Sequence, residues 1–139
     1  MMAWRAWFFI DNRKRNVIVD WLSDEKIPQD QIDMFQSKLD DFERLGPELM
    51  AGFISDTPVA PDAFKMKIKG NSRGWKQLRP MCCKGPFGPT EYTLLLGLIE
   101  RDNKLPKGWH DKFQERLKVL SADRNRRVHE RISDRIPKA

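Results

Sequence analysis

The stretch FKMKIKGNSRGWKQLRPM, residues 64–81, decides the fold class, because it predicts two strands joined by a turn. Apolar residues at 64, 66 and 68 alternate with Lys65, Lys67 and Lys69. A period of two places apolar and basic side chains on opposite sides of a strand. The turn is expected at residues 70–74, and the returning strand runs from Trp75 to Met81. The hairpin therefore predicts a sheet with one basic face.

Toward the C-terminus, the chain predicts a third strand and then a helix. Residues 84–89, KGPFGP, interrupt regular structure, and the apolar run from Tyr92 to Glu100 is typical of a central strand buried on both faces. Apolar residues at 109, 113, 117 and 120 have helical spacing after Gly108. We expect a single domain over residues 1–122. Residues 123–139 are expected to be a basic extension, helical or disordered.

Toward the N-terminus, the pattern predicts a strand and two helices. Aromatic residues are frequent in residues 3–10, which favours a strand, and apolar spacing predicts a helix from Val17 to about Asp24. A second helix is expected from Pro28 to Gly46. Residues 46–63 contain five Gly and Pro residues and are expected to connect two halves without regular structure.

This order of elements predicts an α+β fold. The expected arrangement is a small, mostly antiparallel sheet with the N-terminal helical pair packed on one face and a C-terminal helix.

Length and composition exclude several classes of protein. The chain has 139 residues, of which 40% are hydrophobic and 33% charged, enough apolar material for one core. Because no apolar run is long enough to span a bilayer and no signal peptide is recognisable, we expect a cytoplasmic protein without membrane partners. The adjacent Cys82 and Cys83 provide neither a disulfide framework nor a four-cysteine zinc site.

Charge is distributed unevenly along the chain. Residues 1–64 hold 7 basic and 12 acidic residues, whereas residues 65–139 hold 19 basic and 8 acidic residues. A basic half of this kind is typical of proteins that bind phosphates or an acidic protein partner. A basic surface that only keeps the domain soluble fits the same count.

The lysines of the first predicted strand, with Lys76 and Arg79 of its neighbour, predict a concave basic sheet face. Such a face is suited to hold a polyanion, and its cations are suited to stabilise charge on phosphorus while an RNA 2′-hydroxyl attacks. Trp75, at the edge of this face, is a candidate for stacking on a base. The alternative is that these charges only contact water.

Metal, cofactor and thiol chemistry have weaker sequence signals. His110 and His129 do not have metal-ligand spacing, and Gly70–Gly74 lacks the pattern of a phosphate-binding loop. Lys84 adjoins the cysteines and favours a thiolate, but no histidine or acid is placed beside them, so a small buried hydrophobic role is expected for at least one of them, with a thiol nucleophile as the alternative. We therefore expect no metal and no cofactor.

Three blocks of the chain, in order, resemble the RelE/ParE superfamily of toxins from type II toxin–antitoxin systems, particularly its phage-derived HigB-like branch. The blocks are WRAWFFIDNRKRNVIVDWL with the following helix through ERLGPEL, then FKMKIKGNSRGWKQLRP, then YTLLLGLIERDNKLPKG. They are similar to the family's opening strand and helices, its strand hairpin ending in LRP, and its central strand with the turn that follows. The resemblance implies a RelE-like fold over residues 1–122.

The resemblance also implies a function, a ribosome-dependent messenger RNA endonuclease that needs no metal. It implies two partners, a cognate antitoxin of the helix-turn-helix type and messenger RNA on the ribosome. The catalytic residues implied at matching positions are Arg79, Arg101 and Lys104. The residues expected to bind RNA or its phosphates are Lys65, Lys67, Lys69, Trp75, Lys76 and Lys84.

The chain departs from the family pattern after the LRP motif. The family continues into a strand with basic and aromatic residues, whereas this chain has MCCKGPFGPTEYT, and Lys84 is the cation placed to substitute for a catalytic arginine. Two alternatives stay open, a ParE-like toxin that binds DNA gyrase and an inactive relative that only binds nucleic acid. We also expect Arg79 and Arg101 to be exposed, so that their replacement costs little stability.

Overall fold

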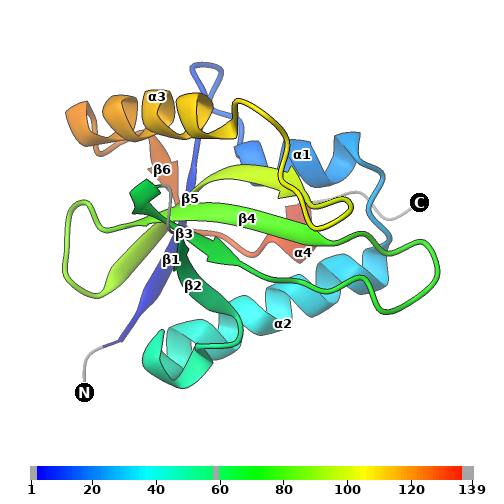
Figure 1. The fold of residues 1–139 in the computed structure, drawn as a ribbon. Coiled ribbons are helices and arrows are strands. Elements are labelled where there is room, and N and C mark those ends of the chain that lie inside the picture. Colours follow the sequence, from blue (N-terminus) through cyan, green and yellow to red (C-terminus); the bar gives the residue numbers. More distant parts are fainter. Residues whose placement is uncertain (1–2, 58–59, 136–139) are drawn as a thin grey trace.

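The computed structural model describes residues 3–57 and 60–135, which form an α+β fold built on a six-stranded sheet (Figure 1). The strand order is β2-β3-β4-β5-β1-β6, with β1 parallel to β5 and all other neighbours antiparallel. The strands are β1 (Arg5–Phe9), β2 (Ile54–Thr57), β3 (Ala60–Met66), β4 (Leu78–Lys84), β5 (Glu91–Ile99) and β6 (Arg127–Val128). The mostly antiparallel sheet that the sequence predicts is confirmed.

Helices lie on both sides of this sheet (Figure 1). The helices are α1 (Val17–Asp24), α2 (Gln29–Leu45), α3 (Trp109–Ala122) and α4 (Ile132–Arg135), with a 3-10 turn η1 (Glu48–Met50). On the α2 side, the ring of Phe42 lies 5.4 Å from that of Tyr92 in β5. On the α3 side, the guanidinium of Arg116 lies 5.8 Å from the centre of the Phe9 ring. The sheet is therefore buried between α2 and α3.

The two N-terminal helices begin and end where the sequence predicts. The Oδ1 atom of Asn16 accepts hydrogen bonds from the backbone N–H groups of Ile18 and Val19, at 2.9 and 3.2 Å, and so caps α1. Helix α2 follows Pro28 and ends at Gly46, whose φ is +84°. This backbone conformation favours glycine, and a Cβ there would also lie 2.6 Å from Nε1 of Trp4.

The prediction that residues 46–63 lack regular structure is wrong. This segment contains η1, the edge strand β2 and the start of β3; the prediction for Pro58 and Val59 falls outside the described residues. Proline is tolerated here because β4 pairs in register only with Phe64 and Lys65, so Pro61 interrupts no pairing with β4. The hydroxyl of Thr57 donates to the carbonyl of Ala60 at 2.8 Å.

The predicted hairpin is shorter than expected. Strand β3 ends at Met66 and β4 begins at Leu78, although Ile68 and Leu78 still form an isolated bridge. Of the three alternating lysines, only Lys65 lies on a strand. Strand β5 and helix α3, in contrast, match the expected third strand and C-terminal helix.

The segment after α3 packs into the domain. Strand β6 pairs with β1, α4 contacts α2, and Ile132 is completely buried. The backbone N–H of Ile132 donates to Oε1 of Gln36 at 2.7 Å. In the expected basic extension over residues 123–139, helical or disordered, the described part contains a short strand and a short helix that pack on the domain, and residues 136–139 lie outside the described residues.

Candidate functional site

The predicted site residues lie in several places and do not form one basic face. Arg101 and Lys104 line a cavity at the end of β5, whereas Lys67, Lys69 and Trp75 line a separate groove beside α2. These two cavities share no lining residue. The remaining predicted residues are Lys65 on β3, Lys76 and Arg79 near the start of β4, and Lys84 at its end.

The cavity at the end of β5 has a volume of about 480 Å³. We call it the β5-end cavity; its walls come from the end of α1, the end of β5 and the following turn, and include Trp21, Glu25, Gly97, Arg101, Lys104 and Leu105. The turn is tight, because Arg101 and Lys104 exchange backbone hydrogen bonds of 3.0 and 2.9 Å. Asp102 and Asn103 between them have φ values of 53° and 60°, which these residue types tolerate better than most.

Trp21 and Gly97 fix the junction between α1 and β5. A Cβ on Gly97 would lie only 2.0 Å from Cδ2 of Trp21, so only glycine permits this approach. The indole therefore packs directly on the backbone of β5. This contact packs the end of α1, next to Glu25, against the part of β5 that leads into the turn with Arg101.

Among the described residues, the charged side chains that line the β5-end cavity are one carboxylate, Glu25, and two cations, Arg101 and Lys104. Arg101 and Lys104 are exposed, and neither side chain has an ion pair within residues 3–57 and 60–135. Glu25 accepts a hydrogen bond from Nζ of Lys76 at 3.0 Å, and its backbone carbonyl accepts another at 3.1 Å. Lys76 therefore joins the site through Glu25. A carboxylate beside unpaired cations is suited to move a proton and bind an anion.

Lys76 is held in place by its backbone. The side chain of Gln31 in α2 accepts from the N–H of Lys76 at 3.1 Å and donates to its carbonyl at 2.6 Å. Gln31 is completely buried. This pair of hydrogen bonds ties the start of the returning segment to α2 and directs Lys76 toward Glu25.

Arg79 is buried, so the expectation that it is exposed is wrong. It is 6% exposed, and its guanidinium donates to Oε2 of Glu100 at 3.0 Å and to the carbonyl of Leu78 at 2.9 Å. Its Nε atom is buried without a hydrogen-bond partner among the described residues. The pairing follows from the register, which places Arg79 opposite Leu98, two residues before Glu100. Its replacement is therefore expected to cost stability.

Sequence reasoning missed both carboxylates. Glu25 directly follows α1 and belongs to no motif or periodic pattern, and Glu100 lies in the third sequence block without a role assigned to it. Only the partner of each identifies it, Lys76 for Glu25 and Arg79 for Glu100. The one available signal was the position of Glu100 directly before Arg101.

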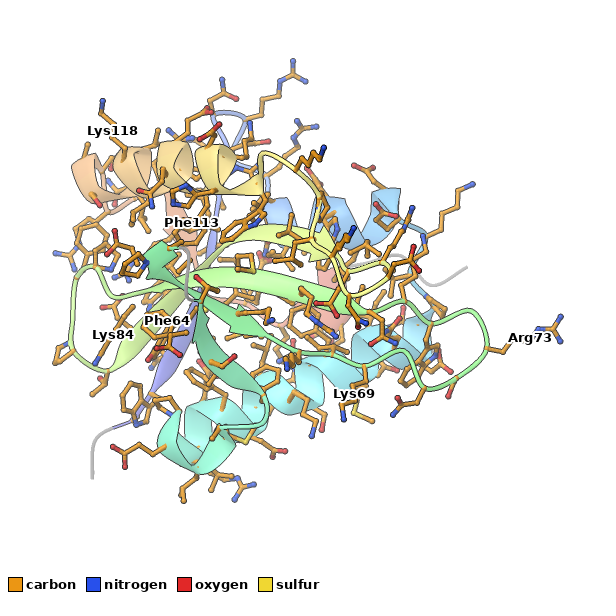
Figure 2. The ribbon with its side chains drawn as sticks, viewed as in Figure 1. Phe64, Lys69, Arg73, Lys84, Phe113 and Lys118 are labelled. Carbon is orange, nitrogen blue, oxygen red and sulfur yellow. The ribbon has the colours of Figure 1, made fainter. Side chains whose placement is uncertain are left out.

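The groove beside α2 has a volume of about 490 Å³. We call it the α2 groove; it lies between α2, η1 and the segment 67–75, and its walls include Met34, Lys38, Leu49, Lys67, Lys69 and Trp75. The indole N–H of Trp75 donates to Oδ1 of Asp30 at 2.9 Å. Figure 2 shows Lys69 well apart from Lys84, which lies toward the opposite end of the sheet.

The cysteines are buried and unsuited to act as nucleophiles. Both thiols are free. Burial raises the pKa of Cys83 to about 12 and the pKa of Cys82 well above its ordinary value of 9.0. Because the thiolate is the reactive form, the raised pKa values disfavour a nucleophilic role for either thiol at neutral pH. The expected burial of at least one cysteine is confirmed. Lys84 is exposed at the end of β4 and lines a cavity with Cys83 and Leu117.

Within the described residues, no group of three or more His, Cys, Asp or Glu side chains is placed to hold a metal ion. No helix of the described chain is long and apolar enough to cross a membrane.

Comparison with known proteins leaves the chain without an assigned family. No family model, no curated protein and no solved structure matches it. The relation to RelE/ParE toxins stays a prediction drawn from the three sequence blocks.

Proposed function

We propose that the protein is the toxin of a type II toxin–antitoxin system and cleaves messenger RNA on the ribosome at the β5-end cavity. The observation that carries the proposal is the composition of this cavity, in which Glu25 lies with Arg101 and Lys104, two cations that form no ion pair with any described residue. The sequence blocks that resemble RelE/ParE toxins support the same reaction. The β1∥β5 pairing beside an antiparallel meander is compatible with the RelE-like fold that they imply.

The proposed reaction uses the side chains of the cavity alone. The carboxylate of Glu25 takes the proton of an RNA 2′-hydroxyl, and the 2′ oxygen then attacks the adjacent phosphorus. Arg101 and Lys104 stabilise the negative charge that develops on the phosphoryl oxygens. The bond from phosphorus to the 5′ oxygen breaks, and that oxygen takes up a proton from the ammonium group of Lys104. The proton that Glu25 accepted is lost to solvent, and Lys104 takes up a proton from solvent before the next cleavage. The products are a 2′,3′-cyclic phosphate and a free 5′-hydroxyl.

Lys76 and Arg79 have positioning roles in this proposal. Lys76 holds Glu25 through the 3.0 Å ion pair, and Arg79 holds Glu100 beside the turn. Arg79 is too deeply buried to contact a phosphate without rearrangement of the end of the sheet. The resemblance implies that Arg79 is catalytic. Its burial instead favours a positioning role, in which Arg79 holds Glu100 beside the turn.

The proposed partners and location follow from the resemblance to RelE/ParE toxins. They are messenger RNA on the ribosome and a cognate antitoxin of the helix-turn-helix type, in the cytoplasm.

A reconstituted translation reaction tests the activity. Purified protein is added with and without ribosomes, and new 5′ ends on the message are mapped. We expect cuts only in the reaction with ribosomes, each leaving a 5′-hydroxyl. Intact message in both reactions would contradict the proposal.

Binding of nucleic acid without cleavage is the second candidate. The burial of Arg79 favours it, because one of the three expected catalytic cations has little access to solvent. Fluorescence anisotropy of a labelled single-stranded RNA would then show binding that weakens steeply with salt, with no new 5′ ends in translation.

A further inference from the structure

The α2 groove combines an apolar surface with lysine side chains. Met34 and Leu49 are the large hydrophobic residues that the described chain leaves exposed, at 42% and 72%, and both line this groove. The groove continues inward to Phe53 and Ile68, which belong to the core. Exposed apolar residues continuous with a groove mark a binding surface more often than scattered ones do.

Three lysines accompany this apolar surface. Lys38 comes from α2, and Lys67 and Lys69 follow β3. None of the three ammonium groups has an ion pair or side-chain hydrogen bond with any described residue, and no Asp or Glu of the described chain lines the groove. The α2 groove therefore presents three ammonium groups that form no ion pair with the described residues.

Trp75 is fixed at one side of the groove. Its indole N–H is already bonded to Asp30, so its remaining contribution is apolar ring surface. Indole rings of this kind are common anchor points in protein interfaces.

We propose that the α2 groove binds a segment of a partner protein that has an apolar face flanked by Asp and Glu residues. Leu49 projects outward, which suits insertion into the apolar surface of a second protein more than enclosure of a small molecule. The lysines then pair with the acidic residues of the segment. This inference goes beyond the proposed RNA cleavage and does not depend on it, because the α2 groove shares no lining residue with the β5-end cavity.

The proposal reassigns Lys67, Lys69 and Trp75 from RNA to protein recognition. RNA binding without sequence preference combines a cationic track with aromatic platforms. The α2 groove instead presents methionine and leucine beside a single tryptophan whose N–H is occupied. Methionine-rich apolar surfaces are typical of sites that bind amphipathic helices.

Selection from a library of random 16-residue peptides displayed on phage tests the proposal with the full chain as target. We expect the recovered peptides to carry Leu, Ile or Phe on one face and Asp or Glu beside it. The affinity of a synthetic recovered peptide is then measured by fluorescence anisotropy. Met34→Ser/Leu49→Ser is expected to weaken it at least tenfold, and Lys38→Gln/Lys67→Gln to weaken it more at low salt than at high salt.

The matched control is Lys112→Gln/Lys118→Gln, which removes two exposed lysines from α3 and should leave peptide affinity unchanged. Circular dichroism melts establish that each variant is folded. Failure to recover any acidic amphipathic peptide, or equal affinity of Met34→Ser/Leu49→Ser and wild type, would overturn the proposal. The proposal would also be overturned if the affinity for a 12-nucleotide RNA fell in the same groove variants as the affinity for the peptide, because the groove would then be a nucleic-acid site.

The translation reaction separates this inference from the proposed function. Met34→Ser/Leu49→Ser is expected to cleave messages as the wild type does while losing peptide binding. Peptide binding without message cleavage in the wild type would leave the α2 groove proposal standing and remove the nuclease proposal.

Discussion

The guanidinium of Arg79 is held between the carboxylate of Glu100 and the backbone carbonyl of Leu78, out of contact with most of the solvent. We predict that Arg79→Met lowers the free energy of unfolding by about 3 kcal/mol, because it leaves Glu100 without its partner. Urea denaturation measures this loss. Arg79→Met/Glu100→Gln should lose less than the single variant, since the unpaired charge is then absent.

Arg101 is the matched control for Arg79. It is exposed and has no ion pair among the described residues, so Arg101→Ala should change the free energy of unfolding by about 0.5 kcal/mol or less. Equal losses in Arg79→Met and Arg101→Ala would contradict the structural role assigned to Arg79.

Gly97 tests the junction between α1 and β5. Gly97→Ala places a methyl group 2.0 Å from a ring atom of Trp21, and we predict a loss of about 1–3 kcal/mol from overpacking. Gly52→Ala is the control, because a Cβ there meets no atom within 4 Å. Thermal melts measure both variants, and we expect a lower melting temperature for Gly97→Ala than for Gly52→Ala. Similar melting temperatures would show that the junction tolerates a side chain at position 97.

The buried thiols predict a stability change at alkaline pH. The pKa of Cys83 rises from its ordinary value of 9.0 in the unfolded chain to about 12 in the folded chain. Between these values the folded state keeps a proton that the unfolded state releases, so stability is fully present below pH 9 and falls as pH rises toward 12. Urea denaturation between pH 8.5 and 10.5 should show a steeper decline for wild type than for Cys83→Ala. If the unfolding free energies of wild type and Cys83→Ala declined equally with pH, the raised pKa of Cys83 in the folded chain would be refuted.

At the scale of elements, the segment from β6 to α4 belongs to the core. Ile132 is completely buried and its N–H is bonded to Gln36, and the guanidinium of Arg127 lies 3.9 Å from the centre of the Trp7 ring. Ile132→Ala is expected to lower the free energy of unfolding by about 2–4 kcal/mol. Asp134→Ala, on the same helix and exposed, should have little effect in the same urea titration. A negligible loss in Ile132→Ala would mean that α4 contributes nothing to the fold.

The sequence predicts well those elements whose apolar pattern extends over many residues. Helix α2 repeats buried residues every three or four positions, and β5 is a continuous apolar run. Strand β2, by contrast, has four residues, and β6 has two. Such short strands form because neighbouring strands pair with them, and this pairing is invisible in a local pattern. The same limit hid the partners of Arg79 and Lys76, which are 21 and 51 residues away.

At the scale of the whole molecule, the positive charge of the C-terminal half is divided among separate surfaces. The β5-end cavity holds Arg101 and Lys104, and the α2 groove holds Lys67 and Lys69. The sequence predicts a basic C-terminal half, but it does not predict that the charge is divided between two surfaces. The division arises because β3 ends at Met66, so Lys67 and Lys69 do not lie on a strand. One basic domain thus presents two surfaces with different surroundings.

The most direct test of the proposed nuclease compares two double variants in the reconstituted translation reaction. Arg101→Ala/Lys104→Ala removes the two cations that line the β5-end cavity in the described chain, and Lys112→Ala/Lys118→Ala removes the same charge from the exposed face of α3. We predict that the first variant loses message cleavage by at least a hundredfold, as expected when transition-state charge is no longer stabilised, and that the second cleaves as the wild type does. Equal cleavage by the two variants would contradict the assignment of catalysis to the β5-end cavity.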